Sequence, residues 1–337
     1  MVLGAWQTST PTLRRPTDPE IIDAINQFPR WHYQFNLGGH YTPIVDRTHI
    51  NRHEQRKAYF FDPLVRLFGG SLAGKRVLDL GCNAGFWSLC AIQSGCDYVF
   101  GIDGRQMHID QAKFVFRVNE IDPRKYSFIK GDIFDVLNQT IGKFDIVLCL
   151  GLFYHISKHM TLLEAISRVN TDVLVIDTTL CTSRGSLLEL ERESLDDARN
   201  AIDHELVMRP TQSAVVEMVR EFGYDIIALK PAFRDYTGAL DYKQGKRRAF
   251  IAAKVTDPRQ AHVAIEPSPS RSRPDVGGIS HASSRLLART LVSRALPLAS
   301  GRRPDVDGVS HASSRFLARA LVSRALRRTW DVLPALW

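Results

Sequence analysis

The sequence predicts an α/β fold: a doubly wound, seven-stranded, mostly parallel sheet over residues 76–254. Short apolar runs rich in β-branched residues alternate there with segments of helical periodicity, which is typical of a parallel sheet with helices on both faces. The last two apolar runs, 224–230 and 247–254, have no helical pattern between them. We expect these two runs to form an antiparallel pair at one edge of the sheet.

The predicted elements follow one another in a regular order. Strands are expected at 76–80, 98–103, 126–130, 144–150, 172–178, 224–230 and 247–254. Helices are expected at 85–94, 105–119, 157–169 and 212–222, with a weak helical turn near 133–138. Because strand–helix–strand crossovers are almost always right-handed, this order gives a Rossmann-like sheet.

The region before this alternation is expected to be a mobile leader (1–20), rich in Thr and Pro, followed by an N-terminal helical cap (21–75). The cap has one helical stretch that starts near Pro19 and another from 55 to 68. Between them, segment 31–43 is aromatic and Gly-rich, as in a loop that covers a site. Its His40 and Tyr41 are candidates for contact with a substrate.

The C-terminal tail, 257–337, is expected to be a disordered or helical extension. Segment 273–285 is repeated at 303–315, but two copies are too few to build a solenoid. The tail holds 13 Arg and 6 acidic residues, whereas residues 1–256 hold 31 basic and 30 acidic ones. The basic tail is therefore either a largely solvated extension or a contact for an acidic partner, a membrane surface or RNA.

Several classes of protein are excluded by composition. No apolar run approaches the roughly 18–20 residues that span a bilayer, and the first residues lack the features of a signal peptide or a myristoylation site. The five cysteines form no C-x-x-C pair, so we expect reduced structural thiols and no metal site. These features favour a cytoplasmic location.

The turn after the first strand gives the strongest functional signal. Asp79, Gly81, Asn83 and Gly85 occupy alternate positions between a strand and a helix. Glycines there allow positive φ and the close approach of a nucleotide-like ligand to the backbone, and the strand–turn–helix setting makes the motif specific. An ordinary tight turn is the alternative.

Two features of this turn favour S-adenosylmethionine (SAM) over NAD. A third small residue, which a dinucleotide-binding loop uses for diphosphate passage and helix packing, is replaced by Phe86. The carboxylate of Asp79 also suits a ligand ammonium group better than a diphosphate. The loop is therefore predicted to bind SAM.

The ends of the next three strands offer further cofactor contacts. Asp103 can accept hydrogen bonds from both ribose hydroxyls, with a helix N-cap as its other possible role. Asp132 can accept from the adenine amino group and Ile133 adds a backbone N–H and an apolar edge, unless the segment is a simple turn. Leu150 and Gly151 would run beside the methionine part of the cofactor.

Two candidate catalytic residues follow the fourth strand, at the point where ligands bind in doubly wound sheets. Tyr154 and His155 would face the reacting methyl group or cap the next helix. Histidine exchanges protons near neutral pH, so His155 is a candidate general base. A hydrogen-bonded structural histidine is the other interpretation.

An insertion, 180–211, lies between the strand at 172–178 and the helix at 212–222. This position in the fold commonly forms a substrate lid. Its acidic residues, which include 189, 191, 193, 196 and 197, would meet a cationic or polyhydroxyl substrate or would belong to a solvated helical face.

Together, these motifs resemble class I SAM-dependent methyltransferases over residues 76–254. Segments 80–86 and 151–155, with 35–43 upstream, are most similar to the subgroup of wobble-uridine tRNA (mo5U34/carboxymethyl) methyltransferases, although Asn36 stands where the subgroup has an acid. The tRNA enzyme has a larger N-terminal region, and the basic residues with which it holds a carboxylated cofactor cannot be matched in this sequence. The resemblance implies the fold, the SAM cofactor and methyltransferase activity.

Three functions are compatible with this resemblance. A transferase that methylates an O, N or C atom of a small molecule is the first. A tRNA methyltransferase is the second, but the near-neutral charge of residues 1–256 disfavours it, because phosphate binding needs clustered Lys and Arg. The third is a SAM-binding protein without catalysis.

Overall fold

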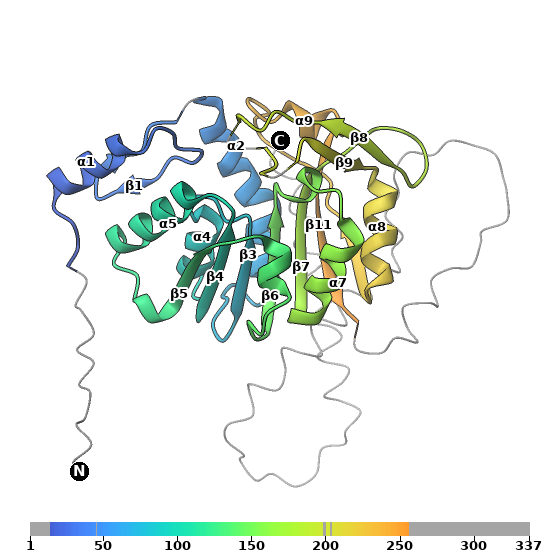
Figure 1. The fold of residues 1–337 in the computed structure, drawn as a ribbon, viewed down its shortest axis with the longest axis horizontal. Helices are drawn as coiled ribbons and strands as arrows, with labels where there is room; N and C mark the ends of the chain where they lie inside the picture. The colour runs from blue at the N-terminus through green and yellow to red at the C-terminus, as the bar shows by residue number, and fades with distance from the viewer. Residues whose placement is uncertain (1–13, 45, 198–199, 203, 256–337) are drawn as a thin grey trace, which may run out of the picture.

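The computed structural model describes residues 14–44, 46–197, 200–202 and 204–255 (Figure 1). Most of the predicted leader and all of the predicted tail with its repeat lie outside the described residues.

Within the described residues, seven strands form one sheet in the order β10-β11-β7-β6-β3-β4-β5 (Figure 1). Neighbours from β5 to β7 run parallel, and β11 is antiparallel to both β7 and β10. The predicted sheet and its antiparallel edge pair are confirmed. The strands are β3 (Arg76–Leu80), β4 (Tyr98–Asp103), β5 (Tyr126–Lys130), β6 (Phe144–Leu150), β7 (Asn170–Thr179), β10 (Tyr224–Ala228) and β11 (Arg247–Lys254).

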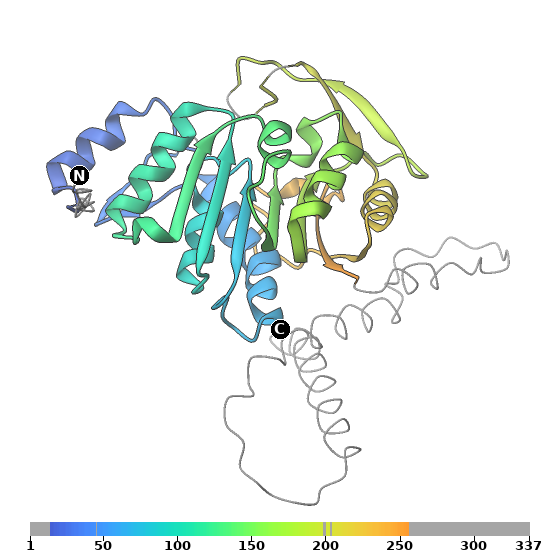
Figure 2. The ribbon, with the colours of Figure 1, turned by 60° about the horizontal axis from the view of Figure 1, so that its bottom comes forward.

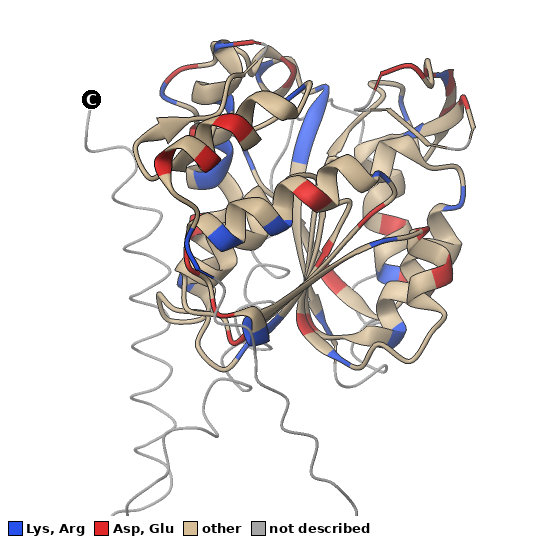
Figure 3. Cartoon of the chain, turned by 60° about the vertical axis from the view of Figure 1, so that its left-hand side comes forward, with Lys and Arg blue, Asp and Glu red and all other residues tan. Residues whose placement is uncertain are grey.

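Helices cover both faces of the sheet, as the view in Figure 3 shows. Alternate residues of each strand point to opposite faces, so Val77 packs with one helical layer and Leu78 with the other. The first layer contains α3 (Asp62–Leu67), α4 (Phe86–Gln93) and α5 (Gln106–Val118). The second contains α6 (Ile133–Leu137), α7 (His159–Val169) and α8 (Gln212–Glu221). A short helix, α9 (Leu240–Lys243), lies between β10 and β11 and was not predicted.

The N-terminal segment begins with α1 (Asp18–Gln27), where Thr17 and Glu20 form a capping box. A hairpin of β1 (Asn36–Leu37) and β2 (His40–Tyr41) follows. A continuous helical run then comprises α2 (Thr48–Arg56), a π-helix (Lys57–Phe61) and α3. It starts seven residues before the predicted helix at 55–68. The π-helix ends two residues before Pro63, which cannot donate the usual helical hydrogen bond and would clash with an earlier carbonyl.

The insertion at 180–211 contains an antiparallel hairpin of β8 (Leu188–Arg192) and β9 (Leu206–Pro210). The interpretation of its acids as a helical face is therefore wrong for residues 188–192. The alternation of Leu and Glu over 188–191 has the two-residue period of a strand. Figure 2 shows the hairpin as yellow-green strands outside the main sheet, and the amide of Met208 donates to the carbonyl of Ile156 at 3.1 Å.

The five cysteines lie in the described part of the chain. All five thiols are free, and four of them are buried. In the part of the chain that is described, no cluster of His, Cys, Asp or Glu is arranged to hold a metal ion. Across the same residues, every helix is too short or too polar to cross a membrane.

Candidate active site

A cavity of about 650 Å³ lies at the carboxyl ends of the parallel strands, beside the point between β3 and β6 where the strand order reverses. The structure brings most of the predicted site residues to its wall: Gly81, Asn83, Asp103, Asp132, Ile133, Leu150, Gly151, Tyr154 and His155. Four other predicted residues are described but do not line it: His40, Tyr41, Asp79 and Gly85.

The loop after β3 reaches the cavity through Gly81 and Asn83. Both have positive φ, +68° and +49°, a region that disfavours residues with a side chain. A Cβ on Gly81 would lie 3.6 Å from Leu152, in ordinary contact, so the backbone conformation rather than crowding calls for glycine. Gly85 (φ +78°) differs, because a Cβ there would approach Ala112 to 3.2 Å. Gly85 therefore serves the packing of the loop against α5.

Asp79 lies behind this loop instead of at the cavity. It shares the strand face of Val77, which α4 covers, and accepts a hydrogen bond from Ser88 Oγ at 2.6 Å. The side chain is 1% exposed. Burial raises the pKa of Asp79 to about 7 despite the opposing effect of this hydrogen bond.

Asp103 organises the cavity wall at the end of β4. Its carboxylate accepts hydrogen bonds from the amides of Asn83 and Arg105, both at 2.9 Å. It also lies 3.0 Å from His108 Nδ1. The N-cap of α5 is Arg105, so Asp103 stabilises the turn before the helix without being the cap itself.

Asp132 has the capping role that Asp103 lacks. It is the N-cap of α6, and one carboxylate oxygen accepts from the amide of Phe134 at 2.6 Å. Because Asp132 also lines the cavity, its structural role and its predicted contact with adenine are compatible.

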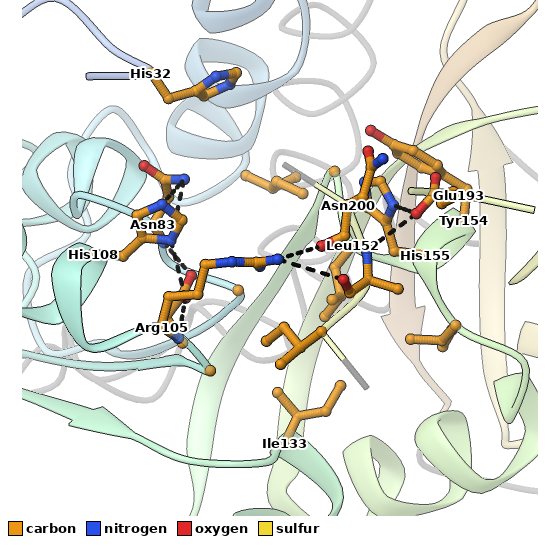
Figure 4. A pocket seen from close by; sticks show the side chains of 18 of the residues that line it. His32, Asn83, Arg105, His108, Ile133, Leu152, Tyr154, His155, Glu193 and Asn200 are labelled. Atoms are coloured by element: carbon orange, nitrogen blue, oxygen red, sulfur yellow. Dashed lines mark hydrogen bonds and ion pairs between the residues drawn. The ribbon is translucent and has the colours of Figure 1, made fainter. Parts of the chain in front are cut away.

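His155 forms a close pair with Glu193, a residue that the sequence analysis did not single out. His155 Nδ1 lies 2.6 Å from Glu193 Oε2, and both side chains are at least 90% buried (Figure 4). Burial alone would raise the pKa of Glu193, but the hydrogen bond and charge of His155 outweigh it and lower that pKa. The backbone amide of Ala201 also donates to Glu193, at 3.1 Å. The pair therefore joins the loop after β6 to the insertion.

The insertion is also attached to the loop after β4. Arg105 Nη2 donates to the carbonyls of Asn200 and Ala201, at 3.1 and 3.4 Å, as the dashed lines in Figure 4 show. Next to this contact, Ile202 packs so closely on Gly104 that a Cβ there would lie 2.0 Å from Ile202 Cδ1. These contacts hold residues 200–202 at the cavity wall.

A buried charge cluster forms the wall beside Tyr154. The carboxylate of Asp177, which is fully buried, lies 2.6 Å from Arg56 Nη2 and 3.0 Å from Arg247 Nη2. It also accepts from the hydroxyl of Tyr242 at 2.8 Å. Burial alone would raise the pKa of Asp177, but the charges of Arg247 and Arg56 lower it to about 2.

Arg56 and Arg247 were not predicted from the sequence. Within segment 31–43, the residues predicted to contact a substrate are not the ones at the cavity. His32 and Tyr33 line the cavity, whereas the β1–β2 hairpin carries His40 and Tyr41 away from it. Tyr41 is 61% exposed, and His40 lies 3.7 Å from Asp18 near the start of α1.

Comparisons with known proteins give one consistent result. A family model described as a methyltransferase domain matches residues 51–229. The ubiquinone biosynthesis O-methyltransferase of Neisseria meningitidis serogroup A / serotype 4A is 28% identical over 120 residues, 35% of this chain and 50% of that protein. The tRNA U34 carboxymethyltransferase of Campylobacter lari is 29% identical over 117 residues, 34% of this chain and 39% of that protein. The matched stretches thus span half or less of these relatives.

A solved structure has the same fold. The N-terminal domain of EvdMO1, crystallised in the presence of SAH and D-fucose, superposes with a TM-score of 0.54 at 19% identity. The superposition covers 72% of this chain and 98% of that domain. The predicted Rossmann-like methyltransferase fold is confirmed.

Proposed function

The chain belongs to the methyltransferase family, and from this premise we propose that it transfers the methyl group of SAM to a hydroxyl oxygen of a small molecule. We propose oxygen as the acceptor atom because His155 Nδ1 lies 2.6 Å from the carboxylate of Glu193. The pair lines the same cavity as the glycine loop after β3.

The residues around the cavity fit SAM. The carboxylate of Asp103 would accept from the ribose hydroxyls, and Asp132 and Ile133 would hold the adenine. Leu150 and Gly151 would adjoin the methionine part. SAM would supply an electrophilic methyl group. A volume of about 650 Å³ is within the usual range for a small-molecule site and leaves room for an acceptor.

His155 and Glu193 are suited to remove a proton from the acceptor. When Nδ1–H donates to the carboxylate, the lone pair on Nε2 is free to take the hydroxyl proton. Glu193 then stabilises the positively charged imidazolium. A hydroxyl oxygen is a weak nucleophile until it loses its proton, whereas a neutral amine is not. A buried, carboxylate-supported base therefore favours an oxygen acceptor.

The surrounding segments would position the acceptor and exclude water. We propose that residues 21–75 act as a cap, the insertion at 180–211 as a substrate lid, and residues 76–254 as the methyltransferase domain. His32 and Tyr33 of the cap line the cavity, and so does Glu193 of the lid. Much of the rate enhancement would come from holding acceptor and donor together in a dry site.

Product identification tests this function. The purified protein is incubated with methyl-labelled SAM and a metabolite extract, and the labelled product is identified by mass spectrometry and NMR. We expect an O-methyl product, formed at least about 100-fold more slowly by His155→Gln, since general bases typically contribute this much or more. His40→Gln, altered outside the cavity, is the matched control. A product labelled on nitrogen or carbon, formed equally fast by His155→Gln, would exclude the proposed chemistry.

A tRNA methyltransferase is the alternative, because the Campylobacter lari relative is a tRNA enzyme. The near balance of charges in residues 1–256 and the interspersed basic and acidic residues in Figure 3 favour a small molecule. Methylation of bulk tRNA by a chain lacking 257–337 would support the RNA substrate. SAM binding without any labelled product from either source would support a non-catalytic role.

Two further expectations from the sequence are kept as proposals. The reduced cysteines favour a cytoplasmic location. The basic tail, 257–337, would contact an acidic partner. Fractionation of cells that express the tagged chain, with and without the tail, would test both.

A further inference from the structure

Helix α2 turns a row of basic side chains inward. His49, Arg52, His53 and Arg56 have the i, i+3, i+4, i+7 spacing of one helical face, a face that a globular protein usually fills with apolar residues. His53 is 4% exposed and Arg56 is 3% exposed. The other two have partly buried side chains, and His49, Arg52 and Arg56 all line the cavity. These four residues are called the α2 basic face below.

The carboxylates that contact the arginines do not balance their charge. Arg56 and Arg247 share the single carboxylate of Asp177, while Arg52 pairs with Asp241 at 2.7 Å. A third carboxylate, Asp46, lies 3.6 Å from His49 and is half exposed. The three guanidinium groups therefore carry one positive charge more than the two carboxylates that they contact. Burying an uncompensated charge is costly unless a ligand supplies the missing partner.

The other acids at the cavity are held elsewhere. Asp103 accepts backbone amides from its own turn, Asp132 caps α6, and Glu193 pairs with His155. Arg56 also retains unused hydrogen-bonding capacity, because its buried Nε has no partner among the described residues. Arg52, Arg56 and Arg247 all line the cavity, so the excess charge belongs to its wall.

This part of the cavity wall adjoins the proposed reaction centre. A Cβ added to Gly151 would lie 3.4 Å from Arg247 Nη2, and Arg247 Nη1 lies 3.5 Å from the hydroxyl of Tyr154. Since His155 follows Tyr154 directly, an anion held by the arginines would be next to the site of methyl transfer.

We propose that the α2 basic face and Arg247 form a carboxylate-binding subsite. Guanidinium groups match the planar, two-oxygen shape of a carboxylate, and such charged hydrogen bonds are strong in a buried setting. The inference rests on the proposed function and adds the class of ligand. The carboxylate is that of an acidic acceptor, which would be a hydroxy acid. The methionine tail of the donor is the other source of a carboxylate in this cavity, and finding it on these arginines would overturn the proposal.

Two calorimetric titrations distinguish these sources. Protein saturated with S-adenosylhomocysteine (SAH) is titrated with 4-hydroxybenzoate and, as an uncharged control, with 4-hydroxybenzyl alcohol. SAH and 5′-methylthioadenosine, which lacks the amino-acid carboxylate, are titrated separately into the unliganded protein. Each titration is repeated with Arg56→Gln and with Arg66→Gln, a matched control at an exposed position on α3.

If the acceptor carries the carboxylate, the acid binds the SAH complex at least tenfold more tightly than the alcohol. Arg56→Gln then removes this preference and Arg66→Gln retains it. If Arg56→Gln instead weakens SAH at least tenfold and leaves 5′-methylthioadenosine unchanged, the arginines hold the carboxylate of the donor. That result would overturn the acceptor subsite.

A folded Arg56→Gln protein that changes neither titration, with no preference for the acid in the wild type, would overturn the subsite. If circular dichroism shows that Arg56→Gln is unfolded, Arg52→Gln takes its place in the same titrations, because the side chain of Arg52 is nearer the surface. Normal SAH binding with no carboxylate effect refutes the subsite alone. Failure of the wild type to bind SAH refutes the proposed function as well.

Discussion

At the scale of single residues, Asp103 connects the fold to the proposed cofactor site. Its carboxylate orders the turns of Asn83 and Arg105 while it lines the cavity. We expect Asp103→Ala to weaken SAH binding by about tenfold or more, since one hydrogen bond to a charged group contributes about 1.5–3 kcal/mol. Calorimetry measures the change, with Asp110→Ala on the exposed side of α5 as the control. Unchanged affinity in folded Asp103→Ala protein would refute the assignment to the ribose.

Glu193 is predicted to act through His155 rather than on the cofactor. Replacing it with Gln keeps the shape but removes the charge that stabilises the imidazolium. We expect kcat to fall by about 10- to 100-fold while SAH affinity stays within twofold, and Glu193→Asp should restore part of the rate. Steady-state kinetics with Glu189→Gln as the control measures this. An equal loss of SAH affinity would indicate that Glu193 only supports the fold.

His159 predicts a pH dependence of stability. It is 2% exposed, burial lowers its pKa to about 4, and a contact of 2.8 Å between its Nε2 and the carbonyl of Phe153 opposes this only in part. In the unfolded chain the pKa is about 6.5, so below that pH the unfolded state takes up a proton that folded His159 resists. The free energy of unfolding is therefore unaffected above pH 6.5 and decreases as the pH falls toward 4. At pH 5 the loss is about 2 kcal/mol.

Urea unfolding at pH 7 and pH 5 measures this loss. His159→Gln should remove this component of the difference between the two pH values, and His40→Gln, at a partly exposed position, should retain it. The same pH difference in His159→Gln and the wild type would rule out His159 as its source.

The residues of the candidate site that could be predicted are those at the carboxyl ends of strands. Asp103, Asp132 and Gly151 follow apolar runs whose ends the sequence marks, and the topology then brings these ends together. Asp79 also precedes the glycine loop, but the two-residue period of β3 turns it toward α4. The partnership of His155 and Glu193 was not predictable, because 38 residues separate them and no local pattern connects them.

At the scale of elements, α2 shows why a helix that lines the cavity was not predicted from apolar periodicity. Its inward face is made of His and Arg instead of Leu and Val, so the search for apolar periodicity found only the part after residue 55. The spacing of 49, 52, 53 and 56 was present in the sequence. Its meaning depended on knowing that a cavity lies on that side of the helix.

The contact between Gly104 and Ile202, in the insertion that we propose to be a lid, gives a prediction at this scale. A Cβ on residue 104 would lie 2.0 Å from Ile202 Cδ1, so Gly104→Ala must move the end of the Ile202 side chain and weaken its packing against the loop after β4. We expect faster proteolytic cleavage within 180–211 and a KM for the acceptor that is raised several-fold.

The double variant Gly104→Ala/Ile202→Ala removes the clashing methyl group and should recover slow cleavage. Limited proteolysis compares the three proteins, with Ile202→Ala as the control. Equal cleavage rates in the single and double variants would show that the contact does not hold the lid.

At the scale of the whole molecule, the order of elements was enough to predict the sheet. Alternation of apolar strands and helices restricts the topology to a doubly wound layout. The lack of a recognisable helical pattern between the last two apolar runs predicted the antiparallel edge. The hairpin of the insertion was overlooked because β8 is mostly exposed and rich in charge. Its alternation was read as a solvated surface.

We propose that this cavity holds SAM with its methyl group directed toward His155. A crystal structure of the SAH complex tests it most directly. We predict ribose hydroxyls within hydrogen-bonding distance of Asp103, adenine beside Ile133, and the sulfur atom facing Tyr154 and His155. SAH bound outside the cavity, or bound within it with the sulfur turned away from His155, would contradict this placement of the methyl donor.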